Sequence, residues 1–236
     1  MSSPDAHMVH HHRDVQGGAV RAAVFGISDG LVSNVALILF VAAASTGSDP
    51  VIVAGVAGLL AGAISMAAGE YGSVKAQAEL VERELDIERI SLAEDPELET
   101  RELASIYQSR GIDAEQARAM AVAVMADPEV ALEVHAREEL GVDPDEVGDP
   151  IGSAVSSFVS FAIGALLPLL PWFFIDGTPA MIASAVIGLL IAAGLGLVLA
   201  RFTKRSRLRS ALRYSGLAAG ACALTWIIGS LFGATV

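Results

Sequence analysis

Apolar residues in this chain gather into five long blocks and are not spread at the spacing of a half-buried helix or strand. Each block is about 20 residues or longer, the length at which an α-helix crosses a hydrocarbon layer of ~30 Å. The pattern therefore predicts five transmembrane helices. The first block lacks a small-residue cleavage site and is longer than the apolar core of a secretion signal, so no signal peptide is expected. The blocks cover residues 22–44, 51–72, 151–175, 179–200 and 214–235.

Charge is concentrated between the second and third blocks. The chain has 236 residues and a formal charge of -12, and residues 75–150 hold 21 of its 27 acidic residues but only 7 of its 15 basic residues. This segment is therefore a soluble, acidic insert in a membrane protein. The sequence predicts an all-α membrane protein with four parts. They are a flexible tail over 1–20, spans one and two over 21–74, the insert over 75–150, and spans three to five over 151–236.

Basic side chains at the ends of the spans indicate the orientation, because Lys and Arg favour the cytoplasmic side of a membrane. Outside the insert they precede span one or lie in the connection between spans four and five, from Arg201 to Arg213. The connections STGSDP and IDGTP contain neither Lys nor Arg. An odd number of spans with a cytoplasmic N-terminus places all these charges on one side. We therefore expect the N-terminus and the insert to face the cytoplasm.

One carboxylate interrupts the first block, in the stretch RAAVFGISDGLVSNVALILFVAAA. Asp29 lies about seven residues from the cytoplasmic end of its span, and Met66 lies at a similar depth in the antiparallel second span. With a rise of 1.5 Å per residue, both are roughly 10 Å deep and can face each other. A carboxylate within a bilayer is costly unless it lines a cavity, meets a partner or titrates. The small and polar neighbours of Asp29 favour a water-filled path; they are Ser28, Gly30, Ser33 and Asn34.

Glu70 follows Met66 by one helical turn toward the cytoplasm. In a transport path it would be an entry ligand or a proton acceptor. Alternatively, Glu70 pairs with Arg21, which is expected at a similar depth. Asp29 also has an alternative interpretation, in which its oxygens cap a helix that breaks at GISDG.

Small residues recur four positions apart in several blocks. Examples are Gly26 with Gly30 and Gly58 with Gly62. This spacing lets transmembrane helices approach closely. It is typical of tightly packed helices and is compatible with a homodimer.

The insert is predicted to be entirely helical. No Gly or Pro occurs between Ser73 and Asp95, so span two is expected to continue as one long helix beyond the membrane. Three further helices follow from their end signals, namely Asp at the N-cap and Pro or Gly near the termini. The N-caps are Asp95, Asp113 and Asp127, and the glycines expected to end the second and fourth helices are Gly111 and Gly141.

Carboxylates in the insert are spaced to share helix faces, and one histidine shares this spacing. Side chains three or four residues apart project from one side of a helix, so three helices can converge on one metal site. Carboxylates with an imidazole suit Mn²⁺, Fe²⁺, Co²⁺ or Zn²⁺ better than Mg²⁺ or Ca²⁺. The alternative is a solvated acidic surface with an ordinary histidine. The candidate ligands are Glu84, Glu88, Glu99, Glu102, His135 and Glu139.

Motifs for several enzymes are missing from the sequence. A di-iron carboxylate bundle uses Glu-x-x-His motifs, and the insert contains none. No Walker motif occurs, and the single cysteine, Cys222, supports neither a disulfide nor a cysteine metal site. We therefore expect a transporter and not an enzyme, with no prosthetic group and no nucleic-acid partner.

Four motifs together resemble the vacuolar iron transporter family in its prokaryotic branch. They are VFGISDGLVSN and AGAISMAAGEY in the first two spans, REELG at the end of the insert and GALLPLLPWFF in span three. The resemblance implies a five-helix homodimer that moves Fe²⁺, and often Mn²⁺, out of the cytosol in exchange for protons. It places Asp29 and Met66 on the intramembrane metal path. It also matches four insert glutamates to family ligands, namely Glu88, Glu99, Glu102 and Glu139.

The sequence departs from the family pattern at three positions. Ser91 stands where another insert glutamate is expected, and Glu84 is its candidate replacement. His135 stands where the family often has Met, which shifts the expected preference from Fe²⁺ toward Mn²⁺, Co²⁺ or Zn²⁺. Gly58 stands where eukaryotic members carry an acid, and Glu70 is a candidate for that role.

The sequence-based hypothesis is proton-coupled export of a divalent transition metal, Fe²⁺ and also Mn²⁺, across a prokaryotic cytoplasmic membrane. The expected partners are metal ions, protons, the lipid bilayer and a second copy of the chain. The alternative is a membrane-anchored metal sensor or buffer that transports nothing. The N-terminal HMVHHH stretch is given no role.

Overall fold

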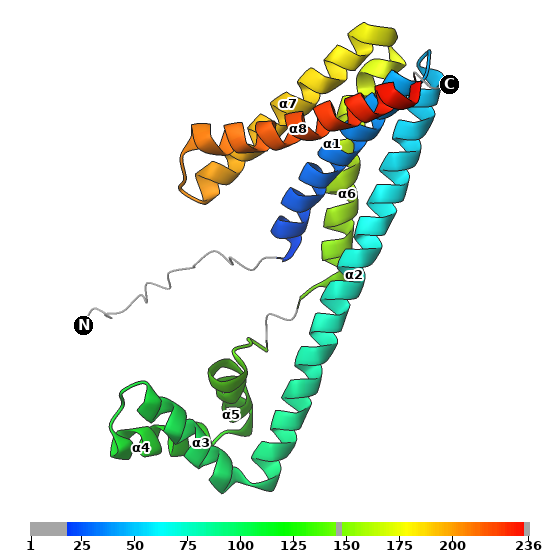
Figure 1. Cartoon of the computed structure of the whole chain (residues 1–236). Helices are drawn as coiled ribbons and strands as arrows, with labels where there is room; N and C mark the ends of the chain where they lie inside the picture. The colour runs from blue at the N-terminus through cyan, green and yellow to red at the C-terminus, as the bar shows by residue number, and fades with distance from the viewer. Residues whose placement is uncertain (1–17, 145–147, 234–236) are drawn as a thin grey trace, which may run out of the picture. The chain divides into compact units, whose positions relative to one another are not determined.

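The structure is a computed structural model that describes residues 18–144 and 148–233, and every regular element in these ranges is helical (Figure 1). The prediction of an all-α protein is confirmed. The N-terminal histidine stretch and most of the predicted tail lie outside the described residues. The long helices are α1 (Gly18–Ala44), α2 (Asp49–Glu94), α6 (Pro150–Leu169), α7 (Gly177–Phe202) and α8 (Arg207–Gly233). The short elements are α3 (Pro96–Ser109), α4 (Ala114–Val124), α5 (Pro128–His135), the π-helical η1 (Ala136–Leu140) and the 3₁₀-helical η2 (Leu170–Phe173).

Five helical segments are long and apolar enough to cross a membrane by length and composition, which confirms the predicted number of spans. They contain 24 to 46 residues. The longest is α2, which is continuous for 46 residues, and no Gly or Pro occurs in it after Gly72. This continuity agrees with the expectation that span two continues as one long helix, and its extension beyond the membrane stays a prediction.

The chain forms two compact units. One, called here the membrane unit, comprises the described residues up to Ala68 and those from Gly152 onward. The other, called here the insert unit, is Gly69–Ile151. The division falls within α2, six residues before the start of the predicted insert, and α2 therefore contributes side chains to both units.

Helix α1 packs against both α7 and α8 in the membrane unit. Its contact with α6 depends on glycines, because a Cβ atom at Gly30 would lie 2.3 Å from the Phe161 carbonyl oxygen. A Cβ at Gly164 would likewise lie 2.4 Å from the Ile27 carbonyl oxygen. The backbones of α1 and α6 thus touch, as expected for small residues at a transmembrane contact. The apolar core around α1 consists of Leu31, Val35, Leu39, Ala192 and Ala218.

Helix α6 ends within the third predicted span, at Leu169, and continues as the 3₁₀ turn η2. Pro168 and Pro171 explain the change, since neither can donate a backbone hydrogen bond. The Pro168 carbonyl accepts a hydrogen bond from the Ser184 hydroxyl at 2.6 Å. The Ser184 oxygen in turn accepts one from the Trp172 indole at 2.9 Å. This buried chain of bonds links the end of α6 to α7.

The predicted caps of the insert helices are present. The side chains of Asp95, Asp113 and Asp127 accept backbone N–H bonds from residues two or three positions later, at 2.9–3.0 Å. Gly111 and Gly141 follow helices with positive φ angles of 92° and 67°, a conformation that glycine adopts without a Cβ penalty.

The last insert helix differs from its prediction. A single α-helix was expected up to Gly141, whereas α5 ends at His135 and the next five residues form the π-helical turn η1. The wider turn directs three consecutive side chains to three different partners. Arg137 contacts Asp143, Glu138 contacts Arg110, and Glu139 faces His135. Periodicity does not reveal such a turn, because it depends on these tertiary contacts.

Candidate functional site

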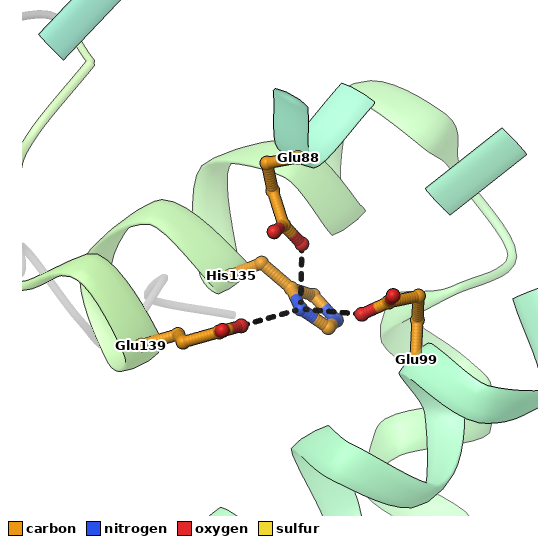
Figure 2. Close-up of side chains that lie close together, drawn as sticks. All are labelled: Glu88, Glu99, His135 and Glu139. Atoms are coloured by element: carbon orange, nitrogen blue, oxygen red, sulfur yellow. Dashed lines mark ion pairs between the residues drawn. The ribbon is translucent and has the colours of Figure 1, made fainter. Parts of the chain in front are cut away.

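Four side chains from four elements of the insert unit meet in one cluster, shown in Figure 2. Glu88 comes from α2, Glu99 from the first turn of α3, His135 from the end of α5 and Glu139 from η1. One ligand atom from each lies within 4.8 Å of the others. We call this group the carboxylate–imidazole cluster.

The imidazole of His135 is at the centre of the cluster. Its Nδ1 atom lies 3.0 Å from Oε1 of Glu88, 3.7 Å from Oε2 of Glu139 and 3.9 Å from Oε2 of Glu99 (Figure 2). His135 is 0% exposed, and Glu88 and Glu99 are each 7% exposed. Glu139 is more open, which leaves one side of the cluster accessible.

Among the described residues, neither ring nitrogen of His135 makes an aligned hydrogen bond, and neither does Oε1 of Glu88, although all three atoms are buried. The 3.0 Å approach of Nδ1 to Oε1 of Glu88 lacks hydrogen-bond geometry. Buried polar atoms in proteins are normally satisfied. One imidazole nitrogen and the carboxylate oxygens can donate electron pairs to one cation, and Nδ1 is the nitrogen that faces the carboxylates. The donor set fits Mn²⁺, Fe²⁺, Co²⁺ or Zn²⁺.

Electrostatics in the cluster favour protons or a metal ion. Burial, followed by the charges of Glu139, Glu99 and Glu102, raises the pKa of Glu88 from 4.5 to about 7. Burial and the charge of Glu102 also raise the pKa of Glu99, against the opposing effect of His135. A metal ion that binds near neutral pH therefore competes with protons for these oxygens.

Two predicted ligands lie outside this cluster. Glu102 is exposed and is not one of the four converging side chains, although its charge acts on Glu88 and Glu99. Glu84 lies one turn before Glu88 on α2 and is not part of the group either. The i, i+3 and i, i+4 spacings identify a shared helix face, but the crossing of the helices decides which member of each pair reaches His135.

A second polar site lies in the membrane unit, where α1, α2 and α6 enclose a cavity of about 250 Å³. Asp29 and Met66 both line it. Helix α1 is continuous through GISDG, and the Ser33 hydroxyl donates to the Asp29 backbone carbonyl at 2.5 Å. The structure therefore contradicts the alternative in which Asp29 caps a broken helix. The polar, soft or small side chains of the cavity wall are Asp29, Ser33, Asn34, Gly58, Ser65 and Met66.

Glu70 is not one of the residues that line this cavity. It lies on α2 one turn after Met66, within the insert unit, and is half-buried. Its predicted role as an entry ligand or proton acceptor stays a prediction.

Asn34 has a more specific position than the sequence indicated. Sequence reasoning placed it only in the polar surroundings of Asp29, but it is 2% exposed and lines the cavity. The available signal was an amide side chain within an apolar block, next to Ser33, which lies one turn after Asp29. Its amide nitrogen donates to the Ala165 carbonyl at 2.7 Å.

A bundle of five apolar helices with a polar cavity, together with a helical unit that clusters carboxylates around an imidazole, defines a multi-pass membrane protein equipped for metal ions. Comparison with known proteins agrees with this class. The family model described as VIT family matches residues 20–230. The chain belongs to the VIT family.

Individual relatives extend the same result. The chain is 32% identical over 225 residues to vacuolar iron transporter 1 of Oryza sativa subsp. japonica, covering 94% of this chain and 89% of the relative. It is 30% identical over 228 residues to vacuolar iron transporter 1 of Arabidopsis thaliana, covering 95% and 91%. It is 38% identical over 161 residues to the vacuolar iron transporter of Acanthamoeba castellanii, covering 67% and 58%. These relatives are transporters, which confirms the prediction of a transporter and not an enzyme.

Proposed function

We propose that this protein exports Fe²⁺, with Mn²⁺ as a second substrate, from the cytosol across a membrane in exchange for protons. The relatives are named as iron transporters, which supports the choice of metal. The observation that carries the proposal is the carboxylate–imidazole cluster of the insert unit, found in the same chain as a membrane cavity lined by Asp29 and Met66.

The insert unit gathers the metal ion in this mechanism. Its formal charge attracts divalent cations, and Nδ1 of His135 with the oxygens of Glu88, Glu99 and Glu139 binds them. Glu102 and Glu84 contribute negative charge near these ligands along α3 and α2. Glu70 then serves as the entry ligand of the membrane path.

The cavity selects and passes the ion. Asp29 supplies a charged oxygen, and Met66 supplies a thioether sulfur. Sulfur is a poor ligand for hard Mg²⁺ and Ca²⁺, which are far more abundant in cells than free Fe²⁺ or Mn²⁺. This pair therefore favours transition metals over the competing hard cations.

Proton coupling follows from the need to deprotonate the ligands. A metal ion that binds Glu88 near neutral pH displaces a proton, because the pKa of this carboxyl is about 7. A carboxylate within the membrane, such as Asp29, is costly without a partner, which favours a cation beside it. Alternate occupancy by metal and proton is the basis of the exchange.

The protein acts as a homodimer in a prokaryotic cytoplasmic membrane, with its N-terminus and insert unit in the cytoplasm. The basic residues at one set of span ends support the orientation, with the N-terminus and the insert unit in the cytoplasm. Exposed apolar side chains along the first half of α2, such as Val53, Leu60 and Ile64, are compatible with lipid or a second copy as neighbours.

The test is metal uptake into inside-out vesicles under an imposed pH gradient, with Fe²⁺ kept anaerobic and Mn²⁺ in parallel. Uptake is expected to require the gradient, and Asp29→Asn should abolish it. Asp49→Asn is the matched control, because Asp49 is exposed and does not line the cavity. Normal uptake by Asp29→Asn would refute the assigned path. Metal binding without uptake in the wild type would instead favour a sensor or buffer.

A further inference from the structure

The cavity of the membrane unit contains a polar atom whose hydrogen-bonding capacity is unused. Oδ1 of Asn34 is buried and has no hydrogen-bond partner, in a residue that is 2% exposed. A buried carbonyl oxygen without a partner lowers stability, so its presence requires an explanation.

The hydrogen bond made by the amide nitrogen fixes the orientation of the Asn34 side chain. The Ala165 backbone oxygen can only accept a hydrogen bond, so the nitrogen of the amide must face it. At 2.7 Å this bond anchors the side chain to α6. The oxygen is therefore directed away from Ala165 and cannot exchange places with the nitrogen without breaking the bond.

Helix α2 approaches this oxygen closely at a glycine. A Cβ atom added at Gly58 would lie 2.9 Å from Oδ1 of Asn34 and 2.6 Å from Cδ2 of Leu37. Gly58 lines the same cavity as Asn34, Asp29 and Met66. A side chain at this position would therefore crowd the oxygen, and glycine avoids that contact.

We propose that Oδ1 of Asn34 is a third ligand for the transported cation, in addition to the Asp29 carboxylate and the Met66 sulfur. The inference rests on the proposed function, because it assumes that the cation occupies this cavity. A divalent cation satisfies the buried oxygen, and carbonyl oxygens are common ligands for such ions.

An uncharged oxygen has a specific consequence for transport. A second carboxylate would neutralise the cation fully and hold it tightly in a region of low dielectric constant. An amide adds a ligand without adding charge, so the ion is coordinated but keeps a net positive charge beside Asp29. The amide also does not titrate, so it adds no proton to the exchange.

The test compares Asn34→Leu and Asn34→Asp in proteoliposomes that contain the full chain, with Mn²⁺ as the probe. Leu matches Asn in approximate size but has no ligand atom, whereas Asp keeps the oxygen. Loss of even an outer-shell group costs about tenfold or more in metal affinity, so Asn34→Leu should raise the half-saturating Mn²⁺ concentration at least about tenfold. Asn34→Asp should lower that concentration, reduce the maximal rate and make uptake more dependent on pH.

A purely structural role for Asn34 gives a different result. Both variants lack the neutral amide donor to Ala165, so both should then lose folded protein or maximal rate to a similar extent, with an unchanged half-saturating concentration. That result would overturn the proposal. If Asn34→Leu does not fold, the result for Asn34→Asp alone distinguishes the two roles. Only a ligand role predicts that Asn34→Asp has a lower half-saturating Mn²⁺ concentration and a steeper pH dependence of uptake.

Two further variants separate this inference from the proposed function. Ser157→Ala is the matched control, since the Ser157 hydroxyl is also buried and unpartnered but does not line the cavity. It should transport as the wild type does. If Asp29→Asn abolishes uptake while Asn34→Leu keeps wild-type kinetics, only the ligand role of Asn34 is wrong. If Asp29→Asn itself transports normally, the proposed path is wrong as well.

Discussion

The Nδ1 atom of His135 lies 3.0 Å from Oε1 of Glu88, which brings the end of α5 against α2 within the insert unit. The two residues are 47 positions apart in the sequence, and both are buried. A buried imidazole close to a buried carboxylate, without an aligned hydrogen bond between them, favours protons or a cation in the cluster. The chemistry of this pair therefore decides how the insert unit responds to metal and to pH.

Replacing His135 should weaken metal binding strongly. His135→Leu introduces an apolar side chain of similar volume and removes the central ligand. The affinity of the cluster for metal should therefore fall at least about tenfold. The measurement is Co²⁺ and Mn²⁺ titration of the full chain in an Asp29→Asn background, which removes a ligand of the membrane cavity. Glu115→Gln, an exposed acid on α4, is the control and should bind normally. His135→Met should recover part of the affinity, with a preference moved from Zn²⁺ toward Fe²⁺. Unchanged binding by His135→Leu would exclude the histidine as a ligand.

Metal affinity should decrease as the pH falls below about 7. Below its pKa of about 7, Glu88 carries a proton that the metal must displace. Each such proton lowers the affinity by up to about tenfold per pH unit. Titrations with Mn²⁺ at pH 6, 7 and 8 measure the slope. Glu88→Gln should bind metal more weakly at pH 8. Its affinity should also depend less steeply on pH, because the proton of Glu88 no longer contributes. Equal slopes in the two proteins would show that Glu88 does not release a proton to the metal.

The metal-free protein should show the opposite pH trend in stability. The pKa of Glu88 is about 7 in the folded chain and 4.5 in its usual state. The folded state thus binds the extra proton between these values, and stability decreases as the pH rises through this window. Glu88→Gln removes the buried charge, so at pH 8 it should be more stable than the wild type by up to about 3 kcal/mol. The difference should vanish near pH 4.5. Thermal unfolding of chelator-treated protein in detergent at both pH values tests the sign.

Glycine at the contact between α1 and α6 should be essential for stability. Gly30→Ala places a methyl group 2.3 Å from the Phe161 carbonyl oxygen, a backbone atom that cannot rotate away. Overpacking of this kind costs about 1–3 kcal/mol. Gly216→Ala on α8 is the matched control, because nothing lies within 4 Å of its added Cβ. Its stability should be unchanged or slightly higher. The measurement is the melting temperature of each variant in detergent. Equal values for Gly30→Ala and Gly216→Ala would mean that α1 and α6 can move apart without loss of stability.

The sequence predicted the helical elements well because their signals are local. Span lengths follow from apolar blocks, and the insert helices begin where Asp95, Asp113 and Asp127 can cap them. The turn η1 was not predicted, since the contacts of Glu138 and Arg137 that accompany it involve residues outside the helix. Local periodicity therefore described the helices up to the point where tertiary contacts change their geometry.

The candidate sites were predicted less completely. Spacing identified the acidic helix faces, but only the packing of α2, α3 and α5 brings Glu88 and Glu99 to His135 while leaving Glu84 and Glu102 outside. In the membrane unit, the rarity of charge in an apolar block singled out Asp29. Asn34 carries no charge, and its unpartnered oxygen becomes visible only when Ala165 and Gly58 are placed around it.

The indole of Trp172, bonded to Ser184 at the end of α6, gives the protein a built-in spectroscopic reporter. The chain has two tryptophans, and both belong to the membrane unit, with Trp172 buried and Trp226 on α8 45% exposed. The insert unit has tyrosines but no tryptophan. Excitation at wavelengths that tyrosine does not absorb therefore observes the membrane unit alone. A shift in this emission on adding metal would report an event among the spans, because the ligands of the insert unit have no tryptophan in their own unit.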